Sequence, residues 1–125
     1  MKPRHFAAAF LIACTAHAQT ASVPRTPVAD PRPLMIAAID SPSGTAHGVL
    51  TGETADVMRR KFNAKTPVLI DVSTEKRYAQ AGCSRLKLRF WQDDVQLPGA
   101  AGPRRQTIEF GINYCRDGRP PRSLS

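Results

Sequence analysis

The sequence predicts a small α+β protein, in which an antiparallel sheet carries a disulfide-stapled C-terminal hairpin and one packed helix. Two stretches, 83–92 and 106–115, alternate apolar and polar side chains, and a period of two is typical of half-buried strands. The first begins with a cysteine and the second ends with one, so a hairpin would bring the two together. A third stretch, about 53–63, has the charge pattern of an amphipathic helix. The chain of 125 residues allows one domain.

The hairpin register follows from placing Cys83 opposite Cys115. Every apolar residue of one strand then faces an apolar residue of the other, and a slip of one residue would place each opposite a polar side chain. We therefore expect a Cys83–Cys115 disulfide, worth roughly 3–4 kcal/mol for a loop of this length; two unpaired buried thiols are the alternative. The predicted cross-strand pairs are Leu86 with Ile112, Leu88 with Phe110, Phe90 with Ile108, and the charge pair Arg89 with Glu109.

The helix is predicted from its ends. Glu53 lies in the first turn and Arg59, Arg60 and Lys61 in the last turns, which complements the helix dipole. We expect Ala55, Met58 and Phe62 to pack on the sheet.

Two further apolar stretches are predicted to be strands. Residues 67–73 alternate and are expected to form a central strand. Residues 34–40 form a short apolar run between turn signals and are expected to form a buried strand. The connection 93–105 is long for a hairpin loop, and such loops are common binding elements.

The N-terminus predicts export. Residues 1–18 have the basic start, short apolar run and Ala-His-Ala cleavage site of a signal peptide. The proline-rich stretch 19–33 is expected to be a disordered leader, 34–118 a single domain, and 119–125 an extended tail. Lipid attachment at Cys14 is the alternative to cleavage after residue 18. With a bacterial-style signal and a disulfide, we expect a periplasmic protein without a transmembrane span.

Charge narrows the choice of partner. Removal of Lys2 and Arg4 with the signal leaves 16 Lys and Arg against 10 Asp and Glu, a formal charge of +6. A basic protein favours acidic partners such as an envelope protein, anionic lipids or glycans. Nucleic acid is uncommon in the periplasm, so we do not expect it as a partner. The alternative is that the charge serves only solubility.

Six residues are candidates for binding. Trp91, Arg104 and Arg105 flank the hairpin loop, and an aromatic side chain beside a loop can anchor a partner. The alternative is that Trp91 packs under the loop or the helix. Arg59, Arg60 and Lys61 could contact an anionic surface, or form a solvated helix end.

The search for catalytic chemistry is negative. His47 is the one histidine outside the predicted signal peptide and the leader, and only Ser41 and Ser43 lie near it in the sequence. One histidine and a disulfide do not make a metal site. We therefore expect no enzymatic activity, no metal and no cofactor.

The stretch GCSRLKLRFWQ, followed by LPGAAGPRRQTIEFGINYCRDGRPP, resembles small exported proteins of proteobacterial conjugative and integrative elements that lie near type IV secretion genes. The resemblance covers residues 82–121 and implies an accessory role in the cell envelope. We expect a periplasmic interaction protein; the alternatives are an inhibitor of a periplasmic or host hydrolase, and a binding module for anionic glycans or lipids.

Overall fold

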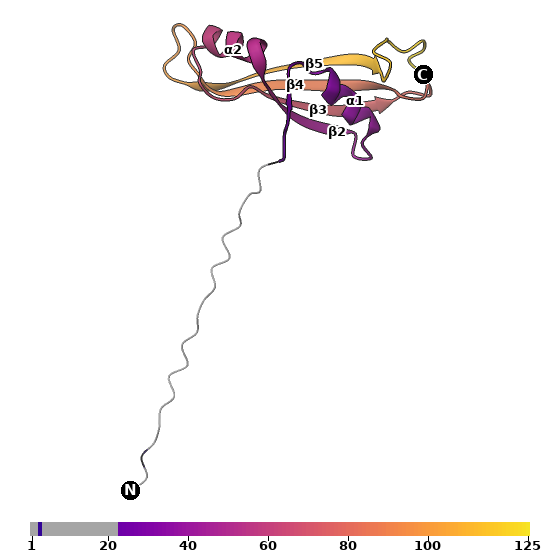
Figure 1. Ribbon diagram of the computed structural model, residues 1–125, viewed down its shortest axis with the longest axis horizontal. Coiled ribbons are helices and arrows are strands. Elements are labelled where there is room, and N and C mark those ends of the chain that lie inside the picture. The colour runs from indigo at the N-terminus through magenta and orange to yellow at the C-terminus, as the bar shows by residue number, and fades with distance from the viewer. Residues whose placement is uncertain (1–2, 4–22) are drawn as a thin grey trace.

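The computed structural model describes residues 3 and 23–125. Residues 23–125 contain one five-stranded sheet and two helices (Figure 1). The strand order is β1-β2-β3-β4-β5; β1 is parallel to β2, and all other neighbours are antiparallel. The small α+β fold is confirmed. The predicted cleavage site and Cys14 lie outside the described residues. The elements are β1 Thr26–Val28, α1 Arg32–Asp40, β2 Thr45–Leu50, α2 Gly52–Lys61, β3 Leu69–Arg77, β4 Cys83–Val95 and β5 Arg104–Cys115.

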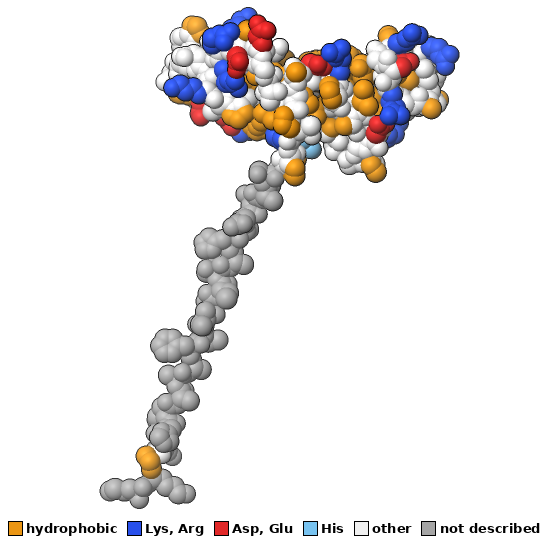
Figure 2. Space-filling model, viewed as in Figure 1, with side chains coloured by type: hydrophobic (Ala, Val, Ile, Leu, Met, Phe, Trp, Pro, Cys, Tyr) orange, Lys and Arg blue, Asp and Glu red, His pale blue; other side chains and the backbone are white. Residues whose placement is uncertain are grey.

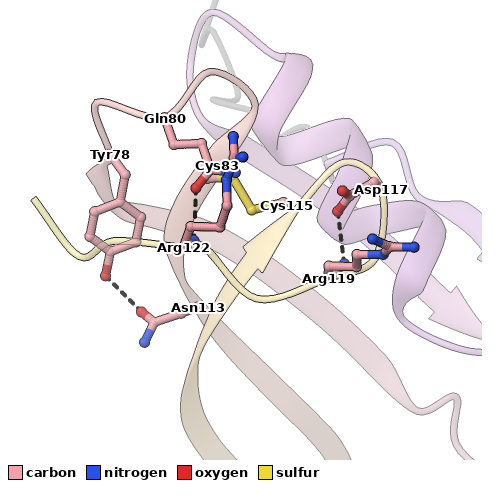
Figure 3. The surroundings of a disulfide bond; sticks show 8 residues. All are labelled: Tyr78, Gln80, Cys83, Asn113, Cys115, Asp117, Arg119 and Arg122. Atoms are coloured by element: carbon pink, nitrogen blue, oxygen red, sulfur yellow. Dashed lines mark hydrogen bonds between the residues drawn. A yellow bond between two sulfur atoms is a disulfide. The ribbon is translucent and has the colours of Figure 1, made fainter.

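The predicted hairpin register is confirmed from the Cys83–Cys115 pair to the Gln92–Gln106 pair. Cys83 lies opposite Cys115, and the two form a disulfide with their Cα atoms 4.0 Å apart (Figure 3). The charge pair Arg89 with Glu109 is also present. Both strands extend further than predicted, so the loop contains residues 96–103 instead of 93–105. The extra length requires an irregularity between Gln92 and Val95, where the register of β4 shifts.

The sheet has two unlike faces because side chains alternate along each strand. The front face carries both helices and the core, including Ile70, Leu86 and Leu88, each at most 1 % exposed. The back face carries mainly polar and charged side chains, among them Asp71 and Arg89. The predicted central strand is confirmed, because β3 lies in the middle of the sheet.

The prediction of a strand over 34–40 is wrong, since these residues belong to helix α1. A short apolar run does not by itself distinguish a strand from a buried helix. Proline at the start of α1 suits a helix, because the first helical N–H groups have no partner within the helix. The buried side chains are Leu34, Met35, Ala38 and Ile39, a spacing that places them on one side of a helix.

The prediction that 19–33 is a disordered leader is wrong for its second half. Residues 26–28 form β1, and Val28 is buried in the core. Arg25 is also held, because its guanidinium donates to the carbonyl of Gly48 at 3.0 Å. The C-terminal residues, predicted to be an extended tail, contain no helix or strand. They lie along the β3–β4 turn, where Ala79 N–H donates to the carbonyl of Ser125 at 2.9 Å.

Helix α2 is confirmed within two residues of its predicted bounds. Its packing differs from the prediction. Ala55 is fully buried and Met58 packs partly against the core, but Phe62 follows the helix and is only half-buried. The helix therefore covers its end of the front face incompletely, and this position decides where the candidate site lies.

Candidate functional site: an apolar groove under α2

A groove of about 220 Å³ lies between α2 and the β4–β5 hairpin on the front face. Met58 and Phe62 line it from the helix side, and Phe90 and Ile108 line it from the sheet. Val95 and Leu97 close the end beside the hairpin loop. For comparison, an engineered apolar cavity of ~150 Å³ is large enough to bind benzene. The groove can therefore accept one aromatic side chain of a partner.

The apolar surface continues from the groove along β5. Ile108 is 55 % exposed and Phe110 is 45 % exposed, although their partners on β4 are buried or half-buried. The sequence predicts that these residues lie on the core side of the hairpin, and they do. Within residues 23–125, however, no segment buries Ile108 and Phe110, whereas Tyr114 on the same side of β5 is buried. An exposed apolar strip beside a groove is typical of an interaction surface.

Two glutamines, Gln92 and Gln106, lie among these apolar side chains. Gln92 lines the groove and is only 4 % exposed. Its Nε2 donates to the carbonyl of Thr66 at 2.9 Å, while its Oε1 is buried without a hydrogen-bond donor in the described structure. A buried acceptor without a partner is costly. An N–H or O–H group entering the groove would supply the missing donor.

Cations lie near the groove, but among the described residues no Lys or Arg side chain lines it. Arg59, Arg60 and Lys61 form the last turn of α2, next in sequence to the groove residue Met58. Arg59 and Arg60 line a separate hollow, and Arg59 is paired with Asp56 on the same helix. Arg104 lines another hollow, which shares Val95 and Leu97 with the groove. In Figure 2, Lys and Arg side chains gather at both ends of the domain, including the end that carries α2. Cations near the groove favour a partner with acidic groups beside its apolar side chain.

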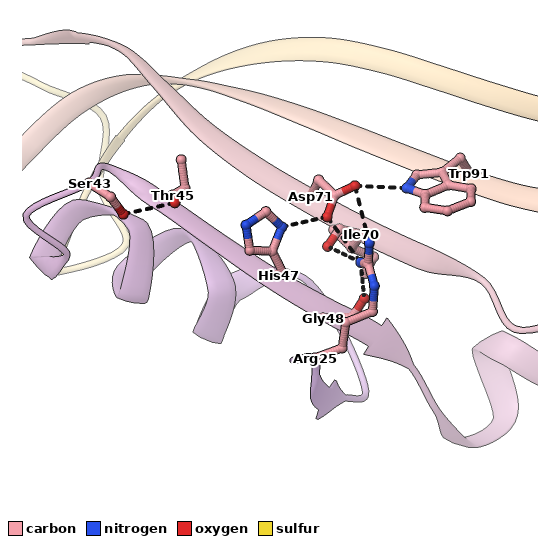
Figure 4. A network of polar contacts seen from close by, with 8 residues as sticks. All are labelled: Arg25, Ser43, Thr45, His47, Gly48, Ile70, Asp71 and Trp91. Carbon is pink, nitrogen blue, oxygen red and sulfur yellow. Dashed lines mark hydrogen bonds and ion pairs between the residues drawn. The ribbon is translucent and has the colours of Figure 1, made fainter. Parts of the chain in front are cut away.

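Trp91 is one of the residues that line the groove, but its indole side chain points to the back face. Its indole N–H donates to Asp71 Oδ2 at 2.8 Å (Figure 4). The guanidinium of Arg105 lies 4.3 Å from the ring centroid. Arg105 is in turn paired with Asp93 at 2.6 Å. The side chain is half-buried, neither a free aromatic anchor nor packed under the loop or a helix. Trp91 therefore helps to hold the back face together.

Asp71 is the centre of this back-face network. His47 Nδ1 lies 2.7 Å from Asp71 Oδ1, and Arg25 Nη1 lies 3.0 Å from the same oxygen. Partial burial raises the pKa of the Asp71 carboxyl, but hydrogen bonds from His47, Trp91 and Arg25 lower it by more, so the pKa lies below its ordinary value. The carboxylate stays charged and ties together β2, β3, β4 and the segment before β1.

The His47–Asp71 contact has the form of a catalytic dyad, but it has no nucleophile. Among the described residues, His47 makes a side-chain hydrogen bond only with Asp71. The hydroxyl of Ser43 is bonded instead to Ser41 and Thr45, both at 2.8 Å. The described residues also contain no group of three or more side chains that could hold a metal ion.

The structure separates the six predicted binding residues into two groups. Arg59, Arg60, Lys61 and Arg104 lie near the groove without lining it. Trp91 lines the groove in part, but its side chain lies with Arg105 on the opposite face. Sequence reasoning missed Gln92 and the Asp71 network. Gln92 could have been noticed, because a polar residue there interrupts the apolar positions 86, 88 and 90. No local signal connects Arg25, His47 and Asp71.

In the part of the chain that the structure describes, no helix has both the length and the apolar character that crossing a membrane requires. Comparison with known proteins finds no matching family model, and neither a curated protein nor a solved structure matches the chain significantly.

Proposed function

We propose that this protein is a small exported interaction protein without enzymatic activity, and that it binds an envelope protein in the groove under α2. The observation that supports this most is the unpaired Oε1 of Gln92 in an apolar groove that has cations in the neighbouring hollows. The partner we propose is a segment that inserts one tryptophan or tyrosine side chain, flanked by acidic residues. The ring would fill the groove and its N–H or O–H would donate to Gln92.

The cellular setting is part of the same proposal. The disulfide between Cys83 and Cys115 is compatible with an oxidising compartment such as the periplasm. The resemblance of residues 82–121 to accessory proteins of conjugative elements supports a partner in a conjugation or type IV secretion system. The protein would then act by occupying or positioning that partner.

The groove can be tested with a defined probe. An acidic peptide with one central tryptophan, labelled with a fluorophore, should bind the protein, and a phenylalanine version should bind roughly fivefold more weakly, because one hydrogen bond is worth ~1 kcal/mol. Gln92→Leu should remove the difference between the two peptides. If neither peptide binds the folded protein, or if Met58→Asp leaves binding unchanged, the groove is not the site.

The cellular partner can be tested by photo-crosslinking from two adjacent positions. A photoreactive amino acid at Ile108 should capture an envelope protein, while one at Thr107, which is exposed on the back face of the same strand, should not. Ile108→Asp should lower mating efficiency and Thr107→Asp should leave it unchanged. Normal mating in both variants would contradict the role in conjugation. Binding to anionic vesicles that needs only Arg59, Arg60 and Lys61 would indicate a lipid-binding module instead.

A further inference from the structure

The outer edge of β5 is the long open edge of the sheet. Within residues 23–125, β5 is 12 residues long and pairs only with β4, whereas the opposite edge strand, β1, is three residues long. Long exposed edges that carry apolar side chains are templates for pairing with another strand. β5 contains no proline, and the register shift of the hairpin lies beyond its pair with Gln92. Its edge is therefore regular over most of its length.

The alternation of hydrogen-bonded and non-hydrogen-bonded pairs along the hairpin shows which backbone groups of β5 face away from β4. Cys83 and Cys115 have Cα atoms 4.0 Å apart, as expected for a pair of opposed residues without mutual hydrogen bonds. Cys115 N–H donates to Arg119, while the next residue, Arg116, donates to Gly82 on the β4 side. Because the register is unbroken, the odd-numbered residues of β5 direct their N–H and C=O groups away from β4. These are the groups that a new strand would bind.

Because only the odd-numbered residues face outward, two copies of β5 can pair antiparallel in only some registers. The odd-numbered residues, whose N–H and C=O groups face outward, must lie opposite one another. The numbers of two opposed residues then add up to an even number, so the two-fold axis passes through a residue position. An axis at Glu109 would place two carboxylates opposite each other, which is unfavourable. An axis at Phe110 places Phe110 opposite itself and Ile108 opposite Ile112 of the second copy, so the exposed apolar side chains of the front face meet.

The back face fits the same register. With the axis at Phe110, Glu109 lies opposite Gly111 of the second copy. Gly111 has no side chain, and the guanidinium of Arg85 lies over it: an added Cβ would be 2.4 Å from Arg85 Nη2. Among the described residues Arg85 forms no ion pair within its own chain. The Glu109 carboxylate of each copy would therefore meet the Arg85 guanidinium of the other.

We propose that β5 is a homodimer interface, in which two copies pair antiparallel about Phe110 and form one continuous ten-stranded sheet. The partner is a second copy of this chain, selected by apolar matching on the front and by two Glu109–Arg85 pairs on the back. The inference does not rest on the proposed function, since the dimer needs no other protein. In this dimer Ile112 of the second copy would stand beside Ile108, at the open side of the groove.

Cysteine crosslinking tests the register. In a Cys14→Ser background, the only other cysteines are the two of the disulfide. Phe110→Cys should give a covalent dimer on mild oxidation, because opposed residues of a non-hydrogen-bonded pair bring their Cβ atoms close. Ile108→Cys alone should remain uncrosslinked, but should crosslink to a chain that carries Ile112→Cys. Crosslinking at position 108 with itself, and not at 110, would overturn the register.

Sedimentation and hydrogen exchange test the dimer in the unmodified chain. The purified protein should sediment as a dimer, and the exchange of the Thr107, Glu109 and Gly111 amides should slow as concentration rises. Phe110→Glu should give a monomer, because two carboxylates would meet at the axis, while Thr107→Glu should remain dimeric. Should Phe110→Glu fail to fold, Glu109→Lys serves instead, since it sets a cation against Arg85. A protein that is monomeric at every concentration would overturn the proposal. If the protein dimerises but does not bind the peptide, the dimer stands and the proposed function fails. If it binds the peptide as a monomer, the proposed function stands and the dimer fails.

Discussion

The two ends of the front face are built from the same hairpin but differ in how completely a helix covers them. At the end that carries the disulfide, α1 buries four side chains. At the other end, α2 buries only Ala55 and leaves the groove. We call these the closed end and the open end.

The difference shows how one amphipathic hairpin can provide both stability and a binding surface. At the closed end, Leu86 is fully buried and opposite a half-buried Ile112. Toward the open end, Phe90 is only half-buried and opposite an exposed Ile108. Burial of apolar surface supplies most of the folding free energy, so the closed end must hold the domain together. At the open end, apolar side chains contact water and can be buried by a partner instead.

The largest effect should come from the disulfide at the closed end. Replacing both Cys83 and Cys115 with serine should lower the free energy of unfolding by roughly 3–4 kcal/mol, because the unfolded chain gains the freedom of the loop between them. Urea unfolding of the variant and of the parent protein measures this. A loss well below 1 kcal/mol would show that the closed end does not depend on the crosslink.

A pair of matched truncations compares the two ends directly. Leu86→Ala should cost about 2–5 kcal/mol, because it leaves a cavity in a fully packed site. Ile108→Ala should cost less than ~1 kcal/mol, since more than half of that side chain is already in water. Chemical unfolding at low protein concentration tests both. Equal losses would mean that the open end contributes to the core as much as the closed end.

Low pH should weaken the Asp71 network on the back face of the sheet, behind both the closed end and the open end. The pKa of Asp71 is lowered in the folded protein, so its contribution to stability is complete above its unfolded pKa of ~3.9 and is lost as the pH falls through the folded pKa. Asp71→Asn should therefore cost ~1 kcal/mol at neutral pH and reduce the loss of stability below pH ~4. Thermal melts from neutral to acid pH check this. An unchanged acid profile would exclude Asp71 as its source.

The smallest effect should come from the start of α1. Asp30 accepts hydrogen bonds from the backbone and the guanidinium of Arg32, and these lower its pKa to about 2. The pair is exposed, so Asp30→Asn should change the melting temperature by little more than the experimental error at neutral pH. A large drop would show that the closed end depends on this contact as well as on packing.

Local patterns were sufficient for the hairpin and for α2. The alternation along the two strands and the two cysteines select one register, because a slip of one residue would exchange the faces of a strand. The structure has this register from Cys83 to Gln92. Local patterns were insufficient for residues 34–40, where a short, mostly apolar run suits either a strand or a helix. They were also insufficient for β1, which is three residues long and pairs with a strand about 20 positions away.

The sequence by itself determined the disulfide, the hairpin register, the alternation of faces and the basic character of the chain, because these depend on period, spacing and composition. Only the tertiary structure decided that α2 leaves a groove, that Gln92 presents an unpaired acceptor there, and that Trp91 lies on the other face with Asp71. The physical reason is that coverage depends on where a helix lies relative to a sheet. That position is set by long-range packing, and a periodic pattern shows which side of a strand is apolar without showing what covers it.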